Sequence, residues 1–212
     1  MEYPISLAVE DFAPVLLTVA GVLVLRNVFP ARRGILAAAA LLGAGGFAKA
    51  TAKLIAAAGG PDLPWLRNLL FPLLTLGFAV LAWVVVGSRA GRIPPWLGFL
   101  VPGLTLACAL GAVLARDPLP MLVSTTVFAT LTGGQLILLA RARGDAIAAG
   151  LFGTQLLVFF LLGPLASRPD QTVALQWAEQ LCNTAAQAAF LVAARRLSAA
   201  PVAAPTDEEL IR

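Results

Sequence analysis

The chain has 212 residues, of which 59% are hydrophobic and only 12% are charged, and its formal net charge is +4. Ordinary soluble domains carry roughly 25% charged residues, so 15 basic and 11 acidic side chains are too few to cover the surface of a soluble fold of this size. The composition therefore excludes a water-soluble globular enzyme, and the apolar content excludes a disordered chain. Because the chain has no histidine, haem sites, most zinc and copper sites and all Ser-His or Cys-His catalytic systems are also excluded.

Apolar runs separated by glycine, proline and charged clusters predict an all-α bundle of seven transmembrane helices. A spanning helix takes about 20 apolar residues, so seven helices and their short connections leave no room for a soluble domain. Residues 1–4 carry no basic region and no clear cleavage site, so we expect the first run to be a retained span. The predicted helices are 7–25, 34–58, 63–87, 96–115, 119–140, 146–166 and 171–194.

Arginines gather in alternate connections of this bundle. They follow the first, third, fifth and seventh predicted helices, whereas the connections at 59–62, 116–118 and 167–170 are poorer in basic residues. Because basic residues favour the cytoplasmic side, the pattern predicts a plasma (inner) membrane protein with its N-terminus outside and its C-terminus in the cytoplasm. The basic clusters are Arg26, Arg32 and Arg33, then Arg89 and Arg92, then Arg141 and Arg143, and finally Arg195 and Arg196.

Two further features concern the organisation of the chain. Residues 1–197 are predicted to form the membrane domain, and the Ala- and Pro-rich residues 198–212 a disordered cytoplasmic tail. Shifts of 110 to 112 residues align the first three helices weakly with the last three, which suggests a parallel 3+1+3 repeat with the fourth helix as a linker. We expect Asp117, Asp145 and Asp170, which lie in connections, to cap helices or form turns.

Ionisable side chains occur within the predicted spans, where each needs a partner or a function. Counted at ~1.5 Å per residue from the cytoplasmic ends of their helices, Glu10 and Lys49 lie ~22 Å and Glu179 ~24 Å into the membrane. Asp11 neighbours Glu10, and Lys53 lies one turn above Lys49 on the same helical face. Three helices thus bring charged groups to one level in the outer half of the bilayer.

The seventh helix adds a polar stripe whose members share one face. Their spacing is i, i+3, i+4, i+7 and i+11, which is helical. Lipid cannot satisfy five such groups, so this face must turn inward or meet water. Gln155 on the sixth helix lies at a similar depth to Gln187 and extends the track toward the cytoplasm. The stripe comprises Gln176, Glu179, Gln180, Asn183 and Gln187.

These residues predict an outward-facing polar pocket between the first, second, third and seventh helices that binds or transports a small polar or amphiphilic molecule or an ion. Two lysines and an arginine suit an anionic or zwitterionic molecule, or a lipid head group. Besides the lipid bilayer and this ligand we expect no nucleic acid, cofactor or metal. The predicted ligand-binding residues are Glu10, Asp11, Lys49, Lys53, Arg67, Asn68, Gln176, Glu179, Gln180, Asn183 and Gln187.

Two alternatives stay open at this point. In the first, Lys49–Glu10 and Lys53–Asp11 are buried pairs that set helix register in a non-catalytic membrane subunit, and the amides bridge helices. In the second, the chain is a lipid-modifying enzyme in which Glu179 and Glu10 or Asp11 form an acid–base pair. The sequence offers no serine nucleophile with a base and no paired-aspartate metal motif, so the enzyme alternative is the weaker one.

Overall fold

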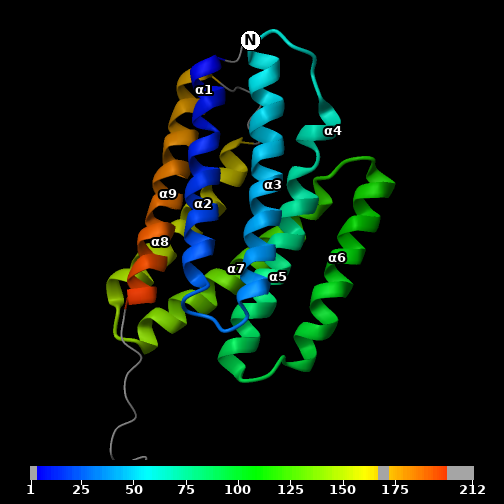
Figure 1. The fold of residues 1–212 in the computed structure, drawn as a ribbon. Coiled ribbons are helices and arrows are strands. Elements are labelled where there is room, and N and C mark those ends of the chain that lie inside the picture. Colours follow the sequence, from blue (N-terminus) through cyan, green and yellow to red (C-terminus); the bar gives the residue numbers. More distant parts are fainter. Residues whose placement is uncertain (1–3, 167–171, 200–212) are drawn as a thin grey trace, which may run out of the picture.

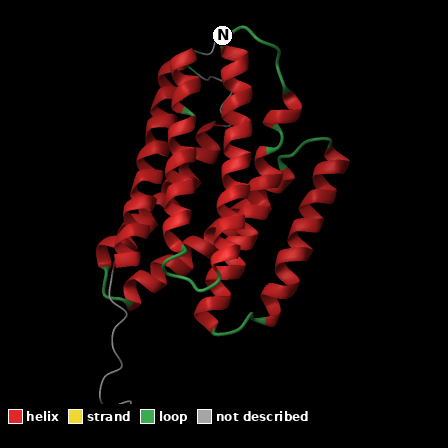
Figure 2. Ribbon diagram, viewed as in Figure 1, coloured by secondary structure: helices red, strands yellow, loops and turns green. Residues whose placement is uncertain are grey.

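A computed structural model of the chain describes residues 4–166 and 172–199 (Figure 1). Within these ranges the chain is helical with short turns and no strand, which confirms the all-α class (Figure 2). The predicted helix ends agree to within a few residues, except that the last helix runs five residues further. The helices are α1 (Ile5–Glu10), α2 (Phe12–Leu25), α3 (Arg32–Ala57), α4 (Pro64–Arg67), α5 (Leu70–Ala90), α6 (Pro95–Ala115), α7 (Pro120–Ala142), α8 (Ala146–Ala166) and α9 (Val173–Ala199).

Two of the predicted helices are each broken near their N-terminal end. The break between α1 and α2 falls at Asp11, three residues before Pro14, and the break between α4 and α5 falls just before Pro72. A proline inside a helix lacks the N–H that would bond the carbonyl four residues earlier, and its ring crowds that carbonyl. The carbonyls affected are those of Glu10 and Asn68, which lie at the two breaks.

Six helices form a ring and the seventh long helix lies outside it. In the ring α2 packs against α3, α3 against α5, α5 against α7, α7 against α8, α8 against α9, and α9 against α2. The green helix α6 stands at the edge of the bundle, where it contacts α7 and, more sparsely, α5 (Figure 1). Glycines allow the close approaches within the ring: a Cβ on Gly46 would meet Val15 at 2.6 Å, and a Cβ on Gly45 would meet the Leu70 carbonyl oxygen at 3.1 Å.

The basic connections all lie at one end of the ring. The α2–α3, α5–α6 and α7–α8 turns and the end of α9 are at the bottom of Figure 1, and the α3–α4 connection is at the top. A close-packed apolar core fills the basic half of the ring, built around Leu25, Ile35, Val85, Phe152 and Phe190. The ring is therefore sealed toward its basic end.

Among the described residues, five segments are long and apolar enough to cross a membrane: Ile5–Leu25, Arg32–Ala57, Pro64–Ala90, Pro95–Ala115 and Pro120–Ala142. They indicate a multi-pass membrane protein embedded in a lipid bilayer. Ala146–Leu162 is a shorter apolar stretch, and α9 carries the polar stripe and two arginines, which lower its hydropathy. The expected seven spans and their orientation remain predictions.

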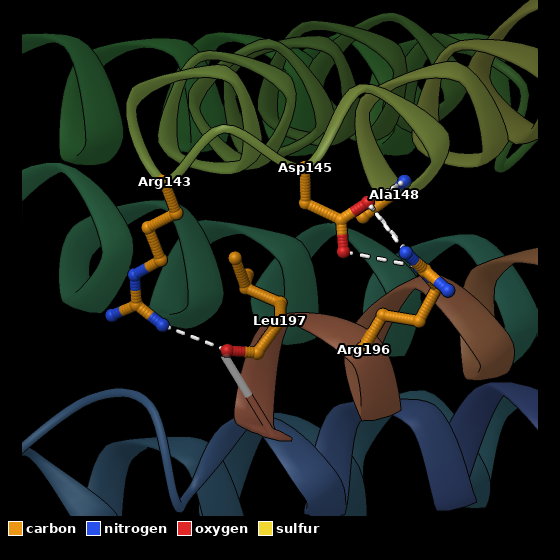
Figure 3. A network of polar contacts seen from close by, with 5 residues as sticks. All are labelled: Arg143, Asp145, Ala148, Arg196 and Leu197. Atoms are coloured by element: carbon orange, nitrogen blue, oxygen red, sulfur yellow. Dashed lines mark hydrogen bonds and ion pairs between the residues drawn. The ribbon is translucent and has the colours of Figure 1, made fainter. Parts of the chain in front are cut away.

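At the basic end, residues of the α7–α8 turn bind the end of α9 (Figure 3). Asp145 accepts a hydrogen bond from the Ala148 N–H at 2.9 Å and pairs with Arg196 at 3.0 Å, while Arg143 donates to the Leu197 carbonyl at 2.7 Å. The Ala148 N–H, followed by Arg196, lowers the pKa of the Asp145 carboxyl below its ordinary value. The capping role expected of Asp145 is thus confirmed.

The structure tests the expected role of only one of the other two aspartates in the connections. Asp117 accepts a hydrogen bond from the Leu119 N–H at 2.9 Å, which confirms its expected role in a turn. Asp170 and residues 200–212 of the predicted tail lie outside the described residues. Residues 198 and 199 belong to α9, which continues because Leu197 is buried against the ring.

Candidate functional site

A cavity of about 350 Å³ lies inside the ring, in the half away from the basic turns. It is enclosed by α2, α3, α5, α8 and α9 and has two chemically different sides. The apolar side comes mainly from α5 and α8 and includes Leu70, Leu74, Phe78, Phe159 and Leu162. The polar side comes from α2, α3, α9 and the α1–α2 break and includes Asp11, Thr18, Lys49, Lys53, Glu179, Gln180, Asn183 and Gln187.

An ion pair joins α3 to the α1–α2 break at the cavity. The Lys53 Nζ atom lies 2.8 Å from the Asp11 Oδ2 atom, and the two side chains keep 29% and 11% of their area exposed. Asp11 lies between α1 and α2, three residues before Pro14, and its backbone keeps right-handed helical dihedral angles. The predicted Lys53–Asp11 pair is therefore present.

Lys49 lies one turn of α3 below Lys53 and also lines the cavity. Asp11 is near enough to act on Lys49 electrostatically, but that carboxylate is ion-paired with Lys53. Within residues 4–166 and 172–199, Lys49 has no ion-pair or hydrogen-bond partner. The polar side thus presents an ammonium group whose charge no carboxylate in this part of the chain neutralises by direct contact.

Four of the five members of the predicted polar stripe of α9 face the cavity. Glu179, Gln180, Asn183 and Gln187 all line the cavity. Gln187 donates to the Asn183 Oδ1 atom at 3.4 Å and accepts from the Thr18 hydroxyl at 3.0 Å, so a chain of hydrogen bonds connects α9 to α2. The Nε2 atom of Gln180 is buried and has no hydrogen-bond partner among the described residues.

Beyond the Thr18–Gln187 hydrogen bond the cavity continues into a void of about 20 Å³. This void shares Thr18, Gln187 and Gln155 with the main cavity, and Thr132 of α7 adds a further hydroxyl. Phe190 and other core residues close it on the basic side. The expected extension of the polar track by Gln155 and Gln187 is present, and it narrows where the apolar core begins.

Four of the predicted ligand-binding residues are not in the cavity wall. Glu10 accepts a hydrogen bond from the Thr184 hydroxyl at 2.8 Å and makes no ion pair with Lys49. The predicted Lys49–Glu10 pair is therefore wrong, because the Glu10 carboxylate points toward Thr184 of α9. Arg67 instead pairs with Asp62 at 3.2 Å in an exposed position. The other two are Asn68, which is exposed, and Gln176, which is half-buried.

The sequence did not predict Thr18 or the apolar side of the cavity. Thr18 is one of many hydroxyl residues in apolar runs, and such a side chain can bond its own helix. The Thr18 hydroxyl shares its one hydrogen between the Gln187 Oε1 atom and the Pro14 carbonyl oxygen, which lies at 2.7 Å. Phe78, Phe159 and Leu162 carry no polar signal, and their place depends on how α5 and α8 turn within the ring. We expected four helices around the pocket, and α8 is a fifth.

Comparisons with protein families, with curated proteins and with solved structures give no match for this chain. The described residues also contain no group of three His, Cys, Asp or Glu side chains that could hold a metal ion. A functional proposal must therefore rest on the chemistry of the cavity.

Proposed function

We propose that this chain is a plasma-membrane protein that binds or transports a small amphiphilic anion or zwitterion in the cavity between α2, α3, α5, α8 and α9. Its N-terminus faces outside, since nine arginines gather at the opposite end, where the positive-inside pattern places the cytoplasm. The cavity then belongs to the outer half of the bundle, and the apolar core separates it from the cytoplasm.

The observation that carries this proposal is Lys49, an ammonium group held at a cavity without a contacting carboxylate among the described residues. A charged side chain within the membrane part of a bundle costs stability unless a partner or water compensates it. An anionic group of a ligand supplies that compensation. Lys53 is already neutralised by Asp11, so Lys49 is the principal anion contact.

The two sides of the cavity define the rest of the ligand. The leucines and phenylalanines of α5 and α8 favour an apolar body, while the amides of α9 can donate and accept hydrogen bonds. A volume of about 350 Å³ is at the lower end of ordinary small-molecule sites, which are roughly 300–1,000 Å³. We therefore expect a compact organic acid or amino acid with a hydrophobic side.

A thermal-shift screen on the purified protein tests this proposal. The panel contains inorganic phosphate, short and branched monocarboxylates, aromatic carboxylates and zwitterionic amino acids. We expect at least one organic anion to raise the Tm of the wild type and to have no effect on Lys49→Met. Arg67→Gln is the matched control, because Arg67 lies near the same end of the bundle but outside the cavity. Equal shifts in wild type and Lys49→Met would refute the proposal.

A structural role is the second candidate, and the Lys53–Asp11 pair favours it. In that case the charged groups only fix the register of α3 against the α1–α2 break. Glu179→Gln separates the two roles: a binding or transport protein keeps its fold and loses ligand binding or uptake into proteoliposomes. A purely structural subunit shows no ligand effect in the wild type and a lower Tm in Glu179→Gln.

A further inference from the structure

A second cavity lies outside the ring, between α5 and α6. It has a volume of about 750 Å³, and its walls are apolar side chains such as Leu76, Val80, Val101 and Leu106, with Trp83 among them. An enclosed apolar void of only ~150 Å³ is enough to take up benzene, so this crevice can hold a much longer hydrocarbon segment. It exists because α6 packs mainly on α7 and only sparsely on α5.

The crevice reaches the basic end of the bundle. Ala31 and Gly34 at the start of α3 form part of its wall, and Arg32 and Arg33 lie between them in the chain. Arg92 lies in the turn that joins α5 to α6. All three arginines are exposed, and none has an ion-pair partner in the part of the chain that the structure describes. Arg89, by contrast, donates to Gln135.

We propose that this crevice binds one anionic phospholipid, with an acyl chain between α5 and α6 and its phosphate group at Arg32, Arg33 and Arg92. The apolar wall from Leu76 to Val84 covers about 12 Å along α5 at 1.5 Å per residue, which is a substantial part of one leaflet of a ~30 Å hydrocarbon core. Basic residues at a membrane surface attract anionic lipids. The proposal rests on the membrane embedding of the bundle and is independent of the ligand of the inner cavity.

A lipid fits this crevice better than a second copy of the chain. Copies inserted into one membrane in the same orientation would bring their basic ends to the same level. Arg32 and Arg33 would then face the arginines of the partner copy, and like charges repel. An anionic head group neutralises the same arginines, and its acyl chain matches the apolar wall. The charges at the mouth of the crevice therefore favour the lipid.

Trp83 is a built-in reporter for the experiment, because its ring lines the crevice. A variant with W65F, W96F and W177F keeps Trp83 as its one tryptophan. It is reconstituted in bilayers that contain phosphatidylglycerol or phosphatidylcholine with brominated acyl chains, and the quenching of Trp83 is compared at equal mole fractions. We expect stronger quenching by phosphatidylglycerol, with an association constant that favours it by about fivefold for each arginine engaged.

Three variants give the control series. R32Q/R33Q/R92Q should abolish the preference for phosphatidylglycerol, whereas R195Q should keep it, because Arg195 is exposed at the same end but lies on α9. V101F narrows the crevice and should reduce quenching by both lipids. Circular dichroism checks that each variant keeps its helices. Native mass spectrometry of the unsubstituted protein provides a second measurement and should show a retained anionic phospholipid.

Three results would refute the proposal or change the occupant of the crevice. Equal quenching of Trp83 by the two lipids in the protein with all three arginines, or a preference that survives R32Q/R33Q/R92Q, would overturn the proposal. Protection of Trp83 from both lipids in a protein that runs as a dimer would assign the crevice to a second copy instead.

Discussion

Asp11→Asn tests how the Lys53–Asp11 pair contributes to the bundle. The two side chains keep 11% and 29% of their area exposed, so the pair falls between two reference cases. Breaking an exposed pair costs about 0.2–1 kcal/mol, and removing one partner of a buried pair costs about 3–5 kcal/mol. We therefore expect Asp11→Asn to lower the free energy of unfolding by about 2 kcal/mol.

The structure also predicts an asymmetry between the two partners. Asp11→Asn removes a carboxylate that acts on both Lys53 and Lys49, whereas Lys53→Gln leaves Asp11 close to Lys49. Lys53→Gln should therefore destabilise the protein less than Asp11→Asn. In the double variant the loss should be about 1–2 kcal/mol smaller than the sum of the single losses, because the partners are in contact.

Reversible unfolding in mixed micelles, followed by circular dichroism, measures these free energies. The exposed Arg67–Asp62 pair is the matched control, since its side chains are 50% and 61% exposed and should couple by less than about 1 kcal/mol. Additive losses at Asp11 and Lys53, or a larger loss for Lys53→Gln than for Asp11→Asn, would refute the electrostatic description of the cavity.

Three further outcomes follow from the packing of the ring. Gly45→Leu should lower the Tm strongly, because a Cβ at this position already meets the Leu70 carbonyl oxygen at 3.1 Å and α3 would have to move away from α5. An unchanged Tm would mean that α3 and α5 are further apart than the structure shows. Thr75→Val should cost about 1 kcal/mol in the same unfolding assay, because the buried Thr75 hydroxyl bonds Met121, Ser124 and Thr125 on α7, and a neutral effect would contradict these contacts. Asp145→Asn should lower the Tm at neutral pH. Since the folded pKa of Asp145 is depressed, its stabilisation is complete above the unfolded pKa of about 3.9 and is lost as the pH falls through the lower folded value. The Tm difference between wild type and Asp145→Asn should shrink over that range, and a difference independent of pH would show that the charge is not responsible.

Much of the arrangement could be predicted from the sequence. The helices follow from runs of apolar residues, and the inward face of α9 follows from the spacing of Glu179, Gln180, Asn183 and Gln187. Lys49 and Lys53 line the same cavity as this face, because a charged side chain within a membrane bundle turns toward the bundle interior or toward water. The weak 3+1+3 repeat stays a prediction.

The error at Glu10 concerns the direction of a side chain. Successive residues of a helix point about 100° apart, so Glu10 bonds Thr184 while its neighbour Asp11 reaches Lys53. Counting residues along a helix predicts the depth of a side chain but not the direction in which it points. The position of α6 outside the ring could not be predicted either, because its apolar sequence suits contact with lipid as well as with other helices.

The thermal stability of Lys49→Met without ligand tests the central claim most directly. If Lys49 is held at the cavity as an anion contact, the methionine keeps the length of the side chain and removes an uncompensated charge, so the protein should gain about 1 kcal/mol, or about 2–4 °C in Tm. The same variant should show no Tm shift with any organic anion that stabilises the wild type. A Lys49→Met protein that melts at a lower temperature than the wild type would show that Lys49 holds the bundle together, and would contradict the ligand-binding function.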